Sequence, residues 1–318
     1  MSLNIFYINL LIIFMSYTIY ILLFLALLSV STSPILGRWM SPELHGVTIA
    51  FWRMTIATAI LWLISMIKYI KPMSVKNRNR TILAGIFLGF HFALFFSSIQ
   101  KTSIAYATFL GTLAPVFTLL IELIILKRKF NYFVIIGLVI SLFGTFIISF
   151  SNTNNAFSFY TDSDNIGKVM AILCSICLAI SYIIAEKVRK NENTFAYTRI
   201  LYLSASIILL PIFIYIISST QSEYLVFSNS YFYLGLIFLG IVPTLFGHNT
   251  IYYAVKYVSP TVVSAFPLGE PIIAIIIAFI LTHFLGFNEF SKDIIISNNI
   301  YIGGFLSLSG LVIITLKK

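Results

Sequence analysis

Glu270 is the residue whose type and position most strongly suggest a chemical role. It is the single acidic side chain in the apolar stretch PLGEPIIAIIIAFI (267–280). A carboxylate is costly to bury in an apolar environment and usually has a partner or a task there. The turn before this stretch centres near 257–259, and Glu270 and His248 lie about equally far from it, roughly 18 Å along antiparallel helices. That depth is close to the middle of a bilayer.

Three interpretations of Glu270 are open at this level. The carboxyl group could lock two helices together, either protonated or paired with the histidine; it could line a substrate cavity; or it could carry a coupling proton. Nearby prolines favour the cavity, because Pro267 and Pro271 lie one helical turn apart and each frees a backbone carbonyl. Pro243 and Gly247 loosen the facing segment in the same way. Irregular backbone at membrane depth is tolerated where it lines a cavity or is buried in protein.

Other residues at a similar depth complete the predicted site. His91 in FLGFHFALFF takes the corresponding place in the first half of the chain, where a packing hydrogen bond is an equal alternative. Aromatic side chains and the hydroxyl groups of SVSTSP (29–34) could face the same polar cavity. The predicted substrate-binding residues are Glu270, His248, His91, Tyr252, Phe95 and Ser33.

Three more charged residues are expected to be structural. Arg53 and Arg199 lie near the starts of two apolar segments, from which long side chains can reach back to the membrane surface. Glu122 lies close to Lys127–Lys129 and is expected to form an ion pair at the membrane interface.

Catalytic and cofactor motifs are absent from the sequence. It contains no HExxH, no GxSxG and no glycine-rich phosphate loop. Cys174 and Cys177 form CSIC inside an apolar segment, without the two further ligands that zinc would need. We expect no catalytic residue, no metal and no cofactor, and we interpret the protein as a non-enzyme.

Composition shows what must position these residues. Of 318 residues, 59% are hydrophobic and 9% are charged, whereas soluble domains carry about 25% charged residues. Ten segments approach the roughly 20 apolar residues that cross a bilayer as a helix. They are expected near 17–37, 46–67, 81–100, 103–126, 130–150, 168–188, 197–217, 231–255, 260–285 and 299–316.

The net charge of +10 has a one-sided distribution that predicts topology. With the N-terminus in the cytoplasm, the outer side holds Arg38, Lys101, Lys168 and Lys292. The cytoplasmic side holds Lys68, Lys71, Lys76, Arg78, Arg80, Lys127, Arg128, Lys129, Lys187, Arg189, Lys190, Lys256, Lys317 and Lys318. This positive-inside bias predicts a multi-pass protein of the cytoplasmic membrane with both termini in the cytoplasm. No nucleic-acid partner is expected, because no basic face belongs to a soluble domain.

The chain also repeats itself. The polar stretch 151–167 separates two sets of five segments, and TFLGTLAPVFTLLIELIIL (108–126) matches SAFPLGEPIIAIIIAFILT (264–282) when Pro115 is aligned with Pro271. Gly137 and Gly144 correspond in the same way to Gly303 and Gly310. An odd number of helices per repeat makes the second half enter the membrane from the opposite side. The prediction is an all-α integral membrane protein with ten transmembrane helices as two inverted five-helix repeats, an architecture with a midplane substrate site.

The expected divisions follow from this repeat. Residues 1–16 form an N-terminal extension that could lie at the membrane interface, 17–150 the first repeat, 151–167 an outer linker and 168–318 the second repeat.

At this point the residues resemble a known family. VPTLFGHNTIYYAVKYVSPTVVSAFPLGEPIIAIIIAFIL, with SPILGRWMSPELHGVTIAFWRM and TSIAYATFLGTLAPVFTLL, is similar to the EamA-type transporters of the drug/metabolite transporter superfamily. The resemblance covers 17–318 and implies a cavity lined by helices one, three, four, six, eight and nine. Family members commonly carry a glutamate at the ends of helices four and nine. Here Lys127–Lys129 takes the first such place, and Glu289 follows the second.

The resulting functional hypothesis is a secondary transporter that works by alternating access. By resemblance its substrate is a small organic metabolite, and an amino acid, a nucleobase or a drug-like amphiphile would suit the residues equally. Coupling to protons or to exchange, the direction of transport and the oligomeric state stay open. The alternatives are a membrane-embedded enzyme acting on a lipid or polyprenyl substrate and a non-transporting membrane scaffold.

Overall fold

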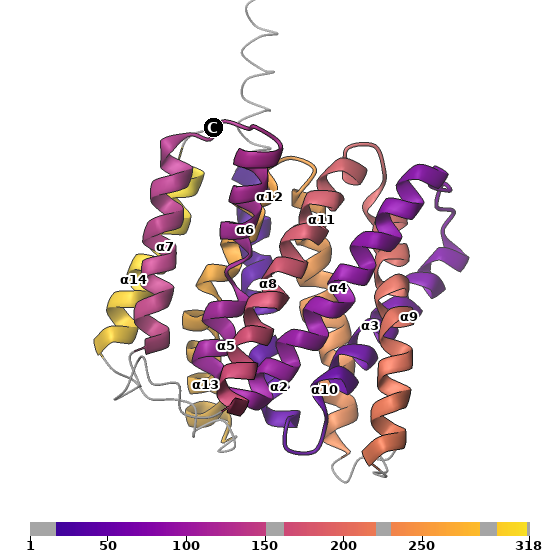
Figure 1. The fold of residues 1–318 in the computed structure, drawn as a ribbon, viewed down its shortest axis with the longest axis horizontal. Coiled ribbons are helices and arrows are strands. Elements are labelled where there is room, and N and C mark those ends of the chain that lie inside the picture. The colour runs from indigo at the N-terminus through magenta and orange to yellow at the C-terminus, as the bar shows by residue number, and fades with distance from the viewer. Residues whose placement is uncertain (1–16, 151–161, 221–229, 287–297, 317–318) are drawn as a thin grey trace, which may run out of the picture.

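The computed structural model of the protein describes residues 17–150, 162–220, 230–286 and 298–316 (Figure 1). Within these ranges it contains no strand and ten helical spans long and apolar enough to cross a membrane. This confirms the predicted all-α membrane fold. The spans are Tyr17–Met40, Gly46–Ile67, Val75–Lys101, Tyr106–Ile125, Tyr132–Ser149, Ser163–Arg189, Thr194–Ser219, Tyr231–Ala254, Pro260–Phe284 and Asn298–Thr315.

Six of the spans are single helices and four are interrupted. The single ones are α3 (Gly46–Ile67), α4 (Val75–Lys101), α7 (Tyr132–Phe150), α8 (Asp162–Arg189), α9 (Thr194–Thr220) and α14 (Asn298–Thr315). In the first span, α2 (Ser33–Met40) follows a turn. The fourth is α5 (Ile104–Gly111), α6 (Ala114–Leu120) and the π-helical η1 (Ile121–Ile125). The eighth is α10 (Tyr231–Leu239), the π-helical η2 (Gly240–His248) and α11 (Asn249–Ala254), and the ninth is α12 (Pro260–Ala265), the 3₁₀ turn η3 (Phe266–Gly269) and α13 (Glu270–Leu285).

Prolines account for the interruptions. Pro34, Pro115 and Pro271 each stand in the first turn of the piece that follows a break, where the missing N–H costs no hydrogen bond and the fixed φ suits a helix. Pro243 lies inside η2 and removes one donor from the helical ladder there. The irregular backbone predicted in helices eight and nine is therefore present, and helix four is interrupted as well.

Two helices begin earlier than their apolar residues predict. The third span starts at Val75 rather than near 81, because Ser74 caps it by accepting a hydrogen bond from the Asn77 amide and the polar run after it is helical. The sixth starts at Asp162, so residues 162–167 of the expected linker belong to α8. The expected extension 1–16, the rest of the linker and Glu289 lie outside the described residues.

The inverted relation of the halves is visible where α7 packs against α14, side by side at one edge of the molecule (Figure 1). A Cβ on Gly137 would lie 2.6 Å from the Gly310 carbonyl oxygen, and one on Gly303 would lie 2.6 Å from that of Gly144. Residues early in one helix thus contact residues late in the other, so the helices are antiparallel. The contact of Gly137 with Gly310 is equivalent by symmetry to the contact of Gly303 with Gly144. Only glycine permits so close an approach of two backbones.

The fourth and ninth spans, which are equivalent in the two repeats, begin with the same kind of serine cap. Ser103 caps α5 by accepting from the Tyr106 amide, and Ser259 caps α12 by accepting from that of Val262. Near the centre of the molecule, α6 packs on α12, and the hydroxyl oxygens of Thr118 and Ser264 lie 3.0 Å apart. The interrupted helices of the two halves therefore cross each other at the core.

Candidate functional site

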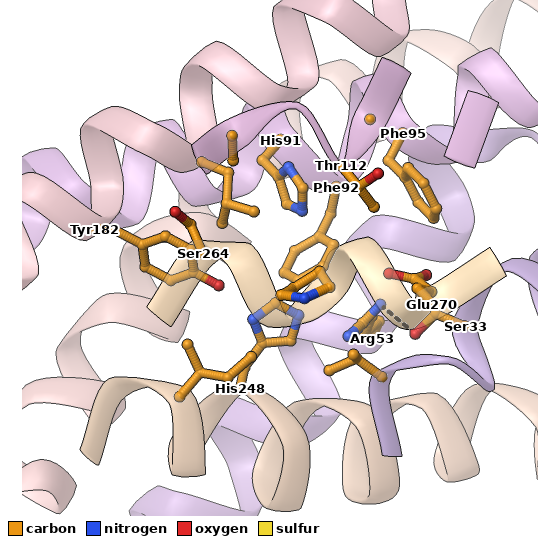
Figure 2. A pocket seen from close by; sticks show the side chains of 16 residues that line it. Ser33, Arg53, His91, Phe92, Phe95, Thr112, Tyr182, His248, Ser264 and Glu270 are labelled. Carbon is orange, nitrogen blue, oxygen red and sulfur yellow. Dashed lines mark hydrogen bonds between the residues drawn. The ribbon is translucent and has the colours of Figure 1, made fainter. Parts of the chain in front are cut away.

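A narrow cavity lies where the interrupted helices meet (Figure 2). Residues from spans one, two, three, four, six, eight and nine line it, so both halves contribute. This set includes all six helices that the family resemblance implied and adds the second. The cavity holds about 40 Å³ of free space, room for a few water molecules. A metabolite would enter only if the lining helices moved apart.

Arg53 is the charged residue that the sequence interpretation placed wrongly. It does not reach the membrane surface; it is 1% exposed and lines the cavity. Its Nε donates to the Thr244 hydroxyl at 2.7 Å, and one terminal nitrogen, Nη1, donates to the Ser33 hydroxyl at 3.1 Å. The guanidinium carbon lies 4.0 Å from the centre of the Phe92 ring. These partners hold the side chain inward, where an aromatic face and hydroxyl acceptors replace part of its hydration.

The hydrogen bonding of Arg53 is incomplete. Its second terminal nitrogen, Nη2, is buried and has no hydrogen-bond partner. A buried donor without an acceptor is costly, and such groups in native proteins call for an explanation. The cavity beside it has room for a few water molecules, so a water molecule or a group of a bound substrate can accept from this nitrogen.

Glu270 stands beside Arg53 at the same side of the cavity (Figure 2). It is 7% exposed and opens the first turn of α13, directly after the 3₁₀ turn η3. No hydrogen bond or ion pair joins its side chain to another described residue. The negative charge is nevertheless compensated at short range, because the guanidinium of Arg53 lines the same cavity.

His248 is near Glu270 in depth, as predicted, but does not pair with it. Both line the cavity, yet the imidazole packs edge-on against Phe92, with ring centres 5.0 Å apart, and its Nδ1 is buried without a partner. The helix lock through a Glu270–His248 pair is therefore not formed in this structure. The geometry places Arg53 next to the carboxylate instead.

His91 makes the packing contact that was one of its two alternatives and also lines the cavity. Its Nδ1 lies 3.0 Å from the Cys174 carbonyl oxygen on α8 and 3.1 Å from the Cys174 Sγ, so the tautomer with the proton on Nδ1 donates to this carbonyl. This is a packing contact between α4 and α8. The ring also lines the cavity and stacks on Phe95, at 6.3 Å between centres.

Five of the six predicted site residues thus lie on the cavity: Glu270, His248, His91, Phe95 and Ser33. Tyr252 does not. It is completely buried behind the wall, with its hydroxyl 3.2 Å from that of Ser181 and its ring against Tyr182 and Tyr197. The neighbouring residue, Ile251, faces the cavity instead. The π-helical turns of η2 explain this, because they shift the residues after them off the regular helical register.

Arg53 could have been found from the sequence by one signal. It lies seven residues inside an apolar helix rather than at its end, and an arginine at that depth usually faces a polar cavity. The two hydroxyl acceptors, Ser33 and Thr244, come from distant segments and give no local signal.

Glu122 pairs with the predicted basic cluster, and its side chain is buried between helices rather than exposed. It is fully buried, accepts from Arg128 at 2.5 Å and also accepts from the Thr261 amide (2.9 Å) and hydroxyl (2.5 Å). Arg128 donates in addition to Glu186 at 2.8 Å. Because Thr261 and Glu186 belong to the second half, this clasp of Glu122, Arg128, Glu186 and Thr261 joins the two repeats at one end of the molecule.

The side chains that the structure describes include no group of three or more His, Cys, Asp or Glu residues that could hold a metal ion. Cys174 and Cys177 are both free thiols, the first of them buried.

Comparison with known proteins agrees with this architecture. The profile of the EamA-like transporter family matches residues 17–150 and again 165–316. A Bacillus subtilis protein named "uncharacterized transporter YxxF" is 25% identical over 76% of this chain and 75% of its own, and an Archaeoglobus fulgidus "uncharacterized transporter" is 24% identical over 77% and 81%. A solved crystal structure with 14% identity superposes with a TM-score of 0.71 over 93% of this chain and 96% of the other, which shows a shared fold.

Proposed function

The chain belongs to the EamA-like transporter family and is a multi-pass membrane transporter, and on this premise we propose that it carries a small zwitterionic organic metabolite, of the amino-acid type, by alternating access. One observation carries this proposal. Arg53, with an unpartnered N–H donor, and Glu270, with a carboxylate that no described residue binds, line one buried cavity.

The two charges match the two ends of a zwitterion. The free nitrogen of Arg53 can donate to a substrate carboxylate, and the Ser33 hydroxyl beside it can add a second hydrogen bond. Glu270 can accept from a substrate ammonium group. A neutral nucleobase or an amphiphilic cation would offer an opposite charge to at most one of these two groups, whereas a zwitterion offers one to each. Of the three substrate classes that suited the sequence, the cavity therefore favours amino acids.

The size and lining of the cavity limit the substrate. Phe92, Phe95 and Leu178 form apolar walls, and only about 40 Å³ is free in this conformation. We infer that this is a closed conformation and that the bound substrate carries a small or apolar side chain.

Polar contacts between the halves at both ends suit alternating access. At one end the clasp ties Glu122 and Arg128 to the second half. At the opposite end, Thr102 of the first half donates to Asp164 of the second at 2.5 Å. Breaking one set while the other holds would open the cavity to one side at a time, as expected for inverted repeats around a midplane site.

The proposed location is the cytoplasmic membrane with both termini inside, on the lysine and arginine asymmetry. Single cysteines replacing Asn79 and Lys101, at opposite ends of α4, test it in a variant without the two native thiols. An impermeant thiol reagent added to intact cells should label the cysteine at 101 and spare the one at 79. The reverse pattern would overturn the orientation.

Transport is tested in proteoliposomes with internal and external solutes defined. We expect uptake of one or more radiolabelled amino acids, recovered chemically unchanged, with competition by other zwitterions. The matching amine and carboxylic acid, each with one charge, should compete poorly. Equal competition by a singly charged analogue would exclude the zwitterion, and a chemically altered product without movement would support the enzyme alternative.

Glu270→Gln is the variant that separates binding from folding. It keeps the shape and removes the charge, so uptake should fall strongly while thermal stability changes little. Glu192→Gln, in the turn between α8 and α9 and hydrogen bonded to Asn77 at 2.7 Å, is the matched control and should transport normally. Wild-type uptake by Glu270→Gln at every pH tested would refute a binding role for this carboxylate.

A further inference from the structure

A second, larger hollow lies on the lateral, lipid-facing surface of the helix bundle, away from the central cavity. It has a volume of about 520 Å³ and lies between α3, α4 and α9, three helices that contact one another and stand together at the right of Figure 1. We call it the lateral cleft. Isoleucines from α4 and α9 form much of its floor, among them Ile82, Ile86 and Ile207. Ile207 is 60% exposed on the surface of the bundle, where a membrane-spanning helix meets lipid.

The charge of the lateral cleft is entirely positive. Arg78 and Arg199 line it, and none of its twelve lining residues is acidic. Neither guanidinium forms a hydrogen bond or ion pair with a described residue, and the Nε of Arg199 is buried without an acceptor. Neither α4 nor α9 carries an acidic residue, and Glu192, two residues before the start of α9, lies outside the lining and accepts from Asn77. The lining therefore offers hydrogen-bond donors and positive charge but no acidic side chain.

Arg78, Arg199 and Trp62 lie near the ends of their helices, at the depth expected for lipid headgroups. Arg78 is three residues from the start of α4, Arg199 five from the start of α9 and Trp62 five from the end of α3. At 1.5 Å per residue, all three lie within about 8 Å of the same end of the bundle. Trp62 is 39% exposed, and the guanidinium carbon of Arg199 lies 5.3 Å from its ring. Tryptophan and arginine are typical of the membrane–water interface.

We propose that the lateral cleft binds an anionic phospholipid. The headgroup phosphate lies between Arg78 and Arg199 and accepts from the free Nε of Arg199, while an acyl chain runs along Ile82, Ile86 and Ile207. A zwitterionic lipid would bring an ammonium group into a cleft without an acidic residue. A free phosphate ion would leave the apolar floor uncovered.

Quenching of Trp62 fluorescence by brominated acyl chains tests this directly. Trp39→Phe and Trp52→Phe leave Trp62 as the single tryptophan of the full-length protein, since the chain has three. The protein is reconstituted into phosphatidylcholine vesicles, and dibrominated phosphatidylglycerol or dibrominated phosphatidylcholine is added at equal mole fractions. We expect phosphatidylglycerol to quench at mole fractions at least about tenfold lower, because each arginine near the surface contributes about fivefold to anionic lipid binding.

Variants identify the site. Arg78→Gln and Arg199→Gln should each weaken the preference for phosphatidylglycerol about fivefold, and Arg199→Lys, which keeps the charge, by no more than about twofold. Arg80→Gln is the matched control, because it lies on the same helix outside the lining, and it should weaken the preference clearly less than either cleft variant. Thermal unfolding of each variant checks that the fold is intact.

Three results would overturn the proposal. They are equal quenching by the two lipids, an equal effect of Arg80→Gln and Arg199→Gln, and displacement of phosphatidylglycerol by millimolar inorganic phosphate. The last would identify an ion site rather than a lipid site. The readout does not involve transport, so its outcome is independent of the function proposed for the central cavity.

Discussion

Arg53 and Arg199 occupy corresponding helices of the two repeats, near the start of the second helix in each half, yet they lie in opposite environments. Arg53 is buried at the central cavity between Thr244, Ser33 and Phe92. Arg199 lies in the lateral cleft, beside Trp62, on the lipid-facing side. Inverted repeats therefore preserve the helix and the residue type without preserving the role.

The difference arises from the neighbours and not from the arginines. Around Arg53, two hydroxyl groups from other helices supply acceptors, and a phenyl face covers the guanidinium. Around Arg199, the neighbours are aliphatic, and the one aromatic partner is itself exposed. A buried arginine needs such a shell because its desolvation is costly, whereas an arginine near the interface can keep its contact with water.

The largest effect is expected when the two arginines are removed in turn. Arg53→Gln should lower uptake of the zwitterion about 10- to 150-fold, because a hydrogen bond to a charged group contributes about 1.5–3 kcal/mol. Arg199→Gln should change uptake no more than about twofold in vesicles of phosphatidylcholine alone, where no anionic lipid is present. Initial rates in matched proteoliposomes measure both, and equal losses would contradict the comparison.

The glycines of α7 and α14, unlike the two arginines, have equivalent environments in the two repeats, and this equivalence can be tested. Gly144→Val and Gly303→Val should each lower the free energy of unfolding by about 1–3 kcal/mol, because a Cβ at either position would lie 2.5–2.6 Å from the carbonyl oxygen of the other. Thermal unfolding in detergent measures the loss. The control is Gly286→Asn, since Gly286 has φ +74° and open space around it and asparagine tolerates this conformation. Unequal losses at 144 and 303 would argue against the symmetry.

The contribution of the residues that contact each arginine can be measured by replacing them. Thr244→Val leaves the Nε of Arg53 without its acceptor and should cost about 1–3 kcal/mol of stability. Trp62→Leu removes a partly exposed cation–π contact from Arg199 and should cost about 0.5–1 kcal/mol. Thermal unfolding of both variants, each combined with the matching arginine-to-glutamine change in a double-mutant cycle, gives the two coupling energies. A larger coupling for Trp62 than for Thr244 would reverse our ranking of the two environments.

The smallest effect is expected at the clasp. Arg128 is 31% exposed, so its ion pairs should contribute no more than about 1 kcal/mol. Arg128→Gln should therefore raise the labelling rate of a cysteine at Ser264, on the cavity wall, by at most about fivefold from the clasp side. Cys174 and Cys177 are replaced in this background. Unchanged labelling would show that the clasp does not keep that side closed.

Much of the architecture could be predicted from the residues alone. Ten apolar segments of sufficient length determine ten spans, and the prolines near Glu270 and His248 predict the irregular backbone of helices nine and eight. Depth was also predictable, because a helix rises a constant 1.5 Å per residue. Counting from a turn therefore placed Glu270 and His248 at one level, and both lie on the cavity.

What the sequence by itself determined is thus which residues cross the membrane, how the halves repeat and how deep each side chain lies. Only the tertiary structure decided which way the side chains face. Lipid and protein core are equally apolar, so membrane helices carry little amphipathic signal about their buried side, and the π-helical turns of η2 alter the register again. For this reason Arg53 lies at the cavity rather than at the surface, Ile251 lines the wall in place of Tyr252, and Glu122 is buried in a contact between the halves.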